Sequence, residues 1–170
     1  MPCALEALVA APAVLRQLVA RAPSAQVVRL DPSLSLVPLT DELFDELASA
    51  TGQTHDDAFA KFPPGLDPVL AELSRTAPIA YVEANYFGGM GSQAAALWQG
   101  GDLRYGPERI DDDVVDPRPI SERPVNRALR RLGVRVDPDA LDEWDTVRLS
   151  RHADSEDWLN EPGEGISATG

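Results

Sequence analysis

Residues 78–105 constrain the fold of this chain most, because apolar and polar side chains alternate along them and two glycine-rich turns interrupt them. Alternation with a period of two is typical of strands that have one buried face. Gly100-Gly101 is a two-residue turn of the kind that accepts positive φ at both positions. The segment therefore predicts a meander of three antiparallel strands, with Trp98 opposite Leu103 in the second hairpin.

The first hairpin of this meander has two possible registers, and the apolar pattern distinguishes them. A four-residue loop would place Glu83 and Asn85 on the apolar face that carries Trp98. A five-residue loop over residues 88–92 aligns four other side chains with that face: Ala80, Val82, Ala84 and Tyr86. A slip of one residue exchanges the two faces of a strand. We therefore predict the five-residue loop, because it keeps the apolar face free of charge.

Short helical patterns flank the meander. Thr40 precedes two acidic residues and then an apolar stripe, which is typical of a capped helix start. Pro68 and Pro124 each stand in the first turn of a further short helix, where the missing N–H of proline costs nothing. Near the N-terminus, the spacing of Leu5, Leu8 and Leu15 also favours helix, divided at a proline.

These patterns predict an α+β protein with one domain over residues 31–161. Its small antiparallel sheet, the meander around residues 78–105, would pack against several short helices. We expect a helical extension over residues 1–30 before this domain and a disordered tail over residues 162–170 after it. A chain of 170 residues with 44% hydrophobic residues can bury a core of this size without disulfides.

The net charge of the chain restricts the class of partner that it can bind. The chain has 28 acidic and 15 basic residues, a formal net charge of −13, so its surface would repel nucleic acid and anionic membranes. An acidic surface instead favours a basic protein partner.

Cys3 is the single cysteine, which excludes a disulfide framework and fits a cytoplasmic protein. No apolar stretch of the sequence reaches the roughly 18 residues needed to span a membrane.

The second face of the meander is the best candidate for a binding surface. In the predicted register, aromatic and polar side chains share this face beside a glycine-rich turn, which is the composition that protein interfaces use. The candidate residues are Tyr81, Glu83, Phe87, Gly88, Gly89, Met90, Gly91 and Gln93. The acidic run Asp111, Asp112 and Asp113 is a further candidate for contact with a basic partner. The alternative interpretation is that helices cover part of this face.

No motif in the sequence indicates a cofactor or a metal. The glycine turn leads into a strand and is followed by no lysine, so it lacks the features of a phosphate-binding loop. His55 with its two following aspartates is typical of a helix cap. An alternative function is a small hydrolase or metal-dependent enzyme that uses His55, His152 and carboxylates, which requires the two histidines to lie within about 5 Å of one another or of a shared carboxylate. The sequence favours a non-enzymatic protein, and self-association is a third alternative.

Two segments carry a resemblance to a known group of proteins. They are Tyr81-x-Glu83-x-x-Tyr86-Phe87-Gly88-Gly89-x-Gly91-x-Gln93-x-Ala95-x-x-Trp98 and Asn126-Arg127-Ala128-Leu129-x-x-Leu132-Gly133-Val134. The pattern, over roughly residues 35–159, resembles small uncharacterised bacterial proteins of the toxin–immunity type. The resemblance implies a cytosolic α+β protein that neutralises a cognate toxin by occluding it. It carries over turn and fold residues and no catalytic residue.

Overall fold

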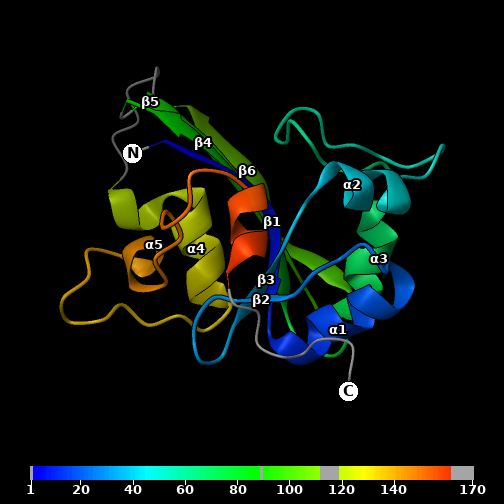
Figure 1. Cartoon of the computed structure of the whole chain (residues 1–170), viewed down its shortest axis with the longest axis horizontal. Coiled ribbons are helices and arrows are strands. Elements are labelled where there is room, and N and C mark those ends of the chain that lie inside the picture. Colours follow the sequence, from blue (N-terminus) through cyan, green and yellow to red (C-terminus); the bar gives the residue numbers. More distant parts are fainter. Residues whose placement is uncertain (1, 89, 112–118, 162–170) are drawn as a thin grey trace.

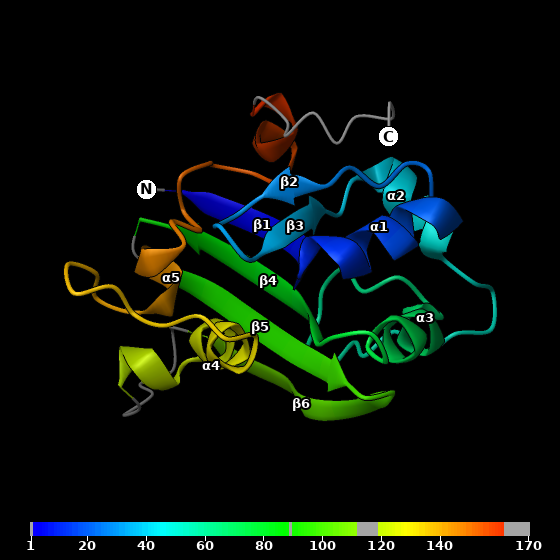
Figure 2. The same ribbon diagram turned by 90° about the horizontal axis from the view of Figure 1, so that it is seen from below.

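The computed structural model describes residues 2–88, 90–111 and 119–161, which form one α+β domain around an antiparallel sheet (Figure 1). The sheet has six strands in the order β2-β3-β1-β4-β5-β6, which can be followed in Figure 2. Its strands are β1 (Cys3–Ala10), β2 (Val28–Arg29), β3 (Ser35–Pro38), β4 (Ile79–Phe87), β5 (Met90–Gln99) and β6 (Asp102–Asp111). The helices are α1 (Pro12–Arg21), α2 (Asp41–Leu47), α3 (Leu66–Leu73), η1 (Ile120–Glu122), α4 (Pro124–Arg131), α5 (Glu143–Thr146) and η2 (Glu156–Asn160).

Helices cover both faces of the sheet. The helices α1, α2 and α3 lie on one side, and α4, α5 and η2 lie on the other (Figure 1). Each side has its own buried cluster. The first, under α1 and α3, includes Leu8, Leu15, Leu70, Tyr81 and Trp98. The second, under α4 and η2, includes Leu5, Val82, Leu97, Leu129 and Trp158. The α+β prediction is confirmed, with a larger sheet than the predicted meander.

The prediction of helix at the N-terminus is wrong for residues 3–10. They form β1, which lies between β3 and β4 in the middle of the sheet, and the helix begins only at Pro12. Val9 packs into one cluster and Leu8 into the other, so β1 is apolar on both faces. A strand buried on both sides loses the polar alternation by which strands are recognised, so its apolar run imitates a helix. The predicted tail over residues 162–170 lies outside the described residues.

The predicted register of the first hairpin is also wrong. Phe87 pairs with Met90, so only residues 88 and 89 separate β4 from β5. Glu83 consequently pairs with Ala94 and shares its face with Tyr81 and Trp98, the arrangement that the sequence argument rejected. In the second hairpin the pairing of Trp98 with Leu103 is confirmed.

Beyond that pair a bulge shifts the second hairpin. Leu97 pairs with Tyr105, and Tyr105 therefore faces the α4 side instead of the Trp98 side. The extra residue of a bulge changes the face of every side chain that follows it, which simple alternation does not anticipate.

Two of the predicted helix starts are confirmed. The Thr40 hydroxyl accepts a hydrogen bond from the backbone N–H of Leu43 at 3.1 Å, and Asp41 and Glu42 follow it in the first turn of α2. Pro124 occupies the first turn of α4, as predicted. β6 continues to Asp111, so the first residue of the acidic candidate run lies on a strand.

Candidate functional site

The candidate face of the meander is divided by the observed register. Tyr81 and Glu83 are buried on the α3 side of the sheet, and Gln93 is buried on the α4 side. Phe87 and Met90, at the end of the β4–β5 hairpin, are 78% and 61% exposed. These residues therefore do not form one continuous surface.

Glu83 is a buried anchor for the chain segment that precedes α3. Its Oε1 accepts a hydrogen bond from the backbone N–H of Ala60 at 2.8 Å, and its Oε2 accepts one from the backbone N–H of Lys61 at 2.9 Å. The Tyr81 hydroxyl donates to the same Oε2 at 2.8 Å. Burial, reinforced by the adjacent negative charge of Glu83, holds the pKa of Tyr81 well above its ordinary value, so this hydroxyl stays protonated as a donor. Glu83 is therefore a structural residue, and it is almost completely buried.

Gln93 has an equivalent role on the opposite face. Its side-chain carbonyl accepts a hydrogen bond from the backbone N–H of Val125 at 2.9 Å, and its amide donates to the Tyr86 hydroxyl at 2.9 Å. The first bond satisfies one of the free N–H groups at the start of α4 and docks that helix on β5. Gln93 is therefore a packing residue.

The remaining candidates lie at the hairpin end and on β6. Gly88 is in the left-handed region at φ 62°, and a Cβ on Gly91 would lie 1.9 Å from the carbonyl oxygen of Asn85. Both glycines are therefore required by the turn and its cross-strand contact. Asp111 pairs with Arg109 at 2.8 Å on β6. Gly89, Asp112 and Asp113 lie outside the described residues.

Glu6 provides a test of how burial acts on the carboxylates of this sheet. It lies opposite Glu83 on β1, and burial raises its pKa, with Glu83 adding in the same direction and a hydrogen bond from Ser155 opposing. A raised folded-state pKa favours the folded protein below the ordinary carboxyl pKa, and this contribution is lost as the pH rises through the raised value. We expect Glu6→Gln to be more stable than wild type at pH 7, by less than about 1 kcal/mol.

The measurement is urea unfolding of both proteins at pH 7 and pH 5. The advantage of Glu6→Gln should shrink at the lower pH, where the wild-type carboxylate begins to be protonated. A variant that is less stable than wild type at pH 7 would contradict the assigned effect of burial.

The two histidines have separate partners. His55 Nε2 lies 2.7 Å from an Asp67 carboxylate oxygen and packs against Phe62, on the α3 side of the sheet. His152 Nε2 lies 2.5 Å from Glu161 and packs against Trp158, on the α4 side. The proximity that the hydrolase hypothesis requires is therefore not met. Within residues 2–88, 90–111 and 119–161, no group of three or more potential metal-ligating side chains occurs.

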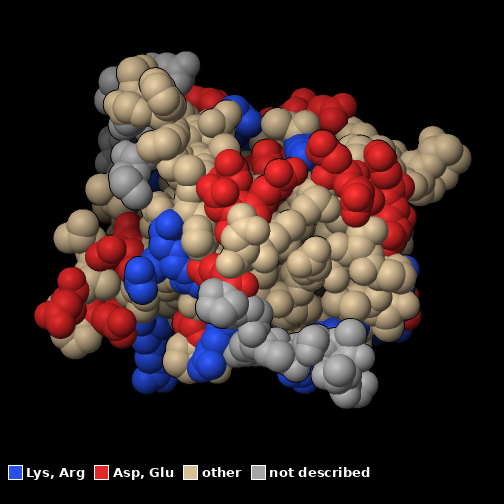
Figure 3. All heavy atoms as spheres, in the orientation of Figure 1, with Lys and Arg blue, Asp and Glu red and all other residues tan. Residues whose placement is uncertain are grey.

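An acidic groove lies beside α2. It has a volume of about 520 Å³ and is lined by Asp41, Phe44, Asp45, Thr54, Asp56, Ala60, Lys61, Phe62 and Pro64. Asp41, Asp45 and Asp56 are exposed, and Glu42, Glu46 and Asp57 add exposed carboxylates nearby. Figure 3 shows acidic side chains gathered over α2.

The single lysine of the chain lies within this groove. Lys61 Nζ contacts Asp41 Oδ1 at 2.9 Å, and this hydrogen bond lowers the pKa of Asp41. The groove thus keeps a strong excess of negative charge around an aromatic and proline floor. The acidic residues at the start of α2 and after His55 are visible in the sequence, but the groove cannot be predicted from it, because the helix and the loop meet only in the folded chain.

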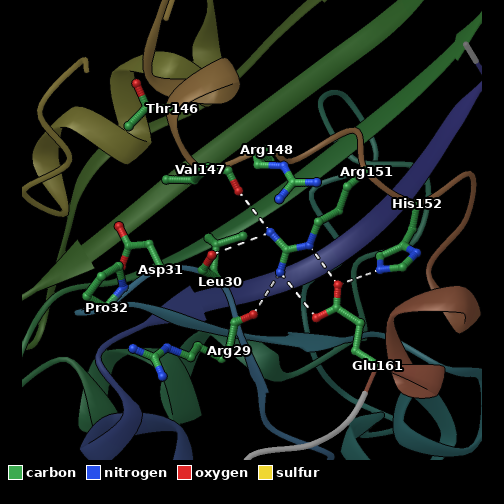
Figure 4. A pocket seen from close by; sticks show the side chains of 10 residues that line it. All are labelled: Arg29, Leu30, Asp31, Pro32, Thr146, Val147, Arg148, Arg151, His152 and Glu161. Carbon is green, nitrogen blue, oxygen red and sulfur yellow. Dashed lines mark hydrogen bonds and ion pairs between the residues drawn. The ribbon is translucent and has the colours of Figure 1, made fainter. Parts of the chain in front are cut away.

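A second hollow lies on the opposite side of the sheet, beside β2. It has a volume of about 760 Å³ and is lined by Arg29, Leu30, Asp31, Pro32, Thr146, Val147, Arg148, Arg151, His152 and Glu161 (Figure 4). Three arginines in one hollow stand out in a chain of net charge −13. We call it the arginine hollow. In Figure 3 several basic side chains lie together on the side of α4 and α5.

No protein-family model, curated protein or solved structure matches this chain. None of the helices in the described part of the chain combines the length and the apolar character needed to cross a bilayer. The assignment of function therefore depends on the chemistry of these two sites.

Proposed function

We propose that this protein is a non-enzymatic binding module that takes up a basic protein partner in the acidic groove beside α2. The observation that carries the proposal is the arrangement of exposed carboxylates, with Asp45 and Asp56 on the rim, around the apolar floor of Phe44 and Phe62. Protein interfaces combine an apolar anchor site with a polar rim in this way. A long basic side chain or an aromatic residue of the partner would fill the groove.

The negative charge of the chain supports a positively charged partner. The net charge of −13 attracts a basic protein over several ångströms and accelerates the encounter. The single ammonium group in the groove is already paired with Asp41, so the remaining carboxylates are left to attract cations of the partner. The same negative charge opposes the binding of nucleic acid.

The specific form that we propose is an immunity-type protein that neutralises a basic toxin by occluding its working surface. Occlusion needs no chemistry from this chain, only a stable and charge-complementary contact. The proposal moves the binding surface from the β4–β5 face to α2, because Tyr81, Glu83 and Gln93 are buried.

Charge reversal on the rim tests this proposal. We expect Asp45→Lys combined with Asp56→Lys to lose capture of the basic partner from a lysate of the native host, with affinity lowered at least about tenfold. The matched control is Asp137→Lys with Asp139→Lys, which changes the net charge equally at two exposed positions between α4 and α5. The control should capture the partner nearly as well as wild type.

Ionic strength gives a second readout of the same experiment. Raising salt from about 50 to about 500 mM shortens the Debye length from roughly 14 to roughly 4 Å, so wild-type capture should weaken strongly. Equal loss of capture in both double variants would mean that only net charge matters and would remove the groove from the account. An acidic partner, or a second copy of this chain alone, would refute the proposed function.

A further inference from the structure

The guanidinium group of Arg151 is held rigidly in the arginine hollow. The group lies over the Trp158 ring, with 4.3 Å between Cζ and the ring centroid. Nη1 donates to the carbonyl oxygens of Val147 at 3.1 Å and Leu30 at 3.4 Å, and Nη2 donates to that of Arg29 at 2.9 Å. These contacts fix the orientation of the group and leave two N–H donors on one edge.

Those two donors bind a carboxylate of the same chain. Nε of Arg151 lies 2.7 Å from Glu161 Oε1, and Nη2 lies 3.2 Å from Oε2, which is the bidentate geometry of an arginine with an oxyanion. His152 Nε2 adds a contact of 2.5 Å to Oε1. Figure 4 shows the three side chains converging on one point. The Arg151 contact, helped by His152, lowers the pKa of Glu161, so the site stabilises a negative charge.

Arg148 extends the positive charge of the hollow beyond this carboxylate. Its guanidinium is exposed and makes no hydrogen bond or ion pair with the residues that the structure describes. Its backbone is in the left-handed region at φ 54°, which is uncommon for a residue with a side chain. Among the lining residues that the structure describes, Asp31 is the other acidic one, and its Oδ1 accepts from the backbone N–H groups of Ser33 and Leu34.

The hollow is larger than Glu161 requires. A volume of about 760 Å³ is in the range of small-molecule sites, and Leu30, Pro32 and Val147 provide apolar wall next to the arginines. The net charge of the chain does not prevent an anion from binding here. Carboxylates more than about 10 Å away are largely screened at ordinary salt, whereas Arg148 and Arg151 would touch the ligand.

We propose that the arginine hollow binds a phosphate monoester, whose phosphate oxygens replace the Glu161 carboxylate on Arg151 and His152. A phosphate monoester dianion carries one more negative charge than the carboxylate that it replaces, and Arg148 supplies the matching positive charge. The organic part of the ligand lies against Pro32 and Val147. Glu161 is then an internal occupant that holds the site in its binding geometry and competes with the ligand. This site is independent of the acidic groove, which lies on the other side of the sheet.

The test is an NMR titration of the full chain with inorganic phosphate and with phenyl phosphate, following the His152 ring and the Arg151 Nε–H signals. We expect saturable shifts with Kd about 1 mM, so that about 10 mM ligand fills roughly nine-tenths of the sites. Glu161→Gln should bind phenyl phosphate about tenfold more tightly, because the competing charge is removed. Arg148→Ala should bind it about tenfold more weakly.

Arg104→Ala is the matched control, because Arg104 is an exposed arginine on β6, away from the hollow. It should bind as wild type does. Absence of shifts in both wild type and Glu161→Gln at about 10 mM phenyl phosphate would overturn the proposal. Equal weakening by Arg148→Ala and Arg104→Ala would also overturn it, as would benzoate binding as tightly as phenyl phosphate. If Glu161→Gln fails to fold, the two arginine variants decide the question in the wild-type background.

Discussion

Glu83→Ala is expected to destabilise the protein by about 3–5 kcal/mol, a large part of the stability of a domain of this size. The substitution leaves the backbone N–H groups of Ala60 and Lys61 without their acceptor, and the buried Tyr81 hydroxyl loses one of its two partners. Unpaired buried donors cost about 1–3 kcal/mol each. The measurement is the free energy of unfolding in urea, with circular dichroism as the probe.

Two further variants separate the role of the carboxylate from that of the strand. Glu83→Gln keeps one acceptor oxygen but turns an NH₂ group toward a backbone donor, so we expect a smaller but clear loss. Phe87→Ala, on the same strand and 78% exposed, should change stability by less than about 0.5 kcal/mol. A Glu83→Ala protein within about 1 kcal/mol of wild type would show that Glu83 does not anchor the preceding segment.

Asn126→Ala is expected to destabilise the protein by about 2–4 kcal/mol. Asn126 is 2% exposed, and its amide donates to the Ile120 carbonyl and to Asp142, both at 3.0 Å. Its side-chain oxygen accepts from the backbone N–H of Trp144 at 2.8 Å. One side chain thus joins α4 to η1 and α5, and alanine leaves the Trp144 N–H without its acceptor and Oδ2 of Asp142 without its donor. Thermal unfolding should show a Tm lower by roughly 5–15 °C.

The pH dependence of a second variant checks this assignment. Asn126→Asp keeps the acceptor for Trp144 but places a second carboxylate about where the amide donor to Asp142 was. Like charges at this distance repel, so the variant should be clearly destabilised at pH 7 and should recover part of its stability at pH 4 as one carboxylate is protonated. Asp139→Ala, at an exposed position, is the neutral control. Full stability of Asn126→Asp at pH 7 would contradict the hydrogen-bond assignment.

Local signals in the sequence were sufficient for some of the elements. The two-glycine turn placed Trp98 opposite Leu103, Thr40 marked the start of α2, and Pro124 marked the start of α4. Each of these depends on backbone chemistry within a few residues. The α+β class followed from them, because three strands follow one another as a meander and the short helices lie outside it.

The errors come from long-range contacts. The apolar run of β1 imitates a helix because both of its faces pack into buried clusters, and this burial depends on residues far from 3–10 in the sequence. The hairpin register failed because Glu83 was assumed to be exposed. Its burial is compensated by the N–H groups of Ala60 and Lys61, more than twenty residues earlier in the chain. A charged residue on an apolar face is permitted wherever such partners exist.

For the candidate sites too, the sequence shows local features, and long-range contacts decide the rest. The sequence indicated a preference for a basic partner through its net charge, and this expectation remains the basis of the proposed function. It placed the contact on a face that the true register buries. The acidic groove joins α2 to the loop that carries Asp56, and the arginine hollow joins β2 to residues 146–161, so both sites depend on the folded arrangement.

Hydrogen–deuterium exchange of the complex with the captured partner tests the central claim most directly, because it locates the contact. We expect slower exchange on binding over residues 41–62, which include α2 and the rim residue Asp56. The hairpin end around Phe87 and Met90 should exchange as in the free protein. Protection confined to that hairpin or to α4, with residues 41–62 unchanged, would contradict the assignment of the acidic groove as the binding surface.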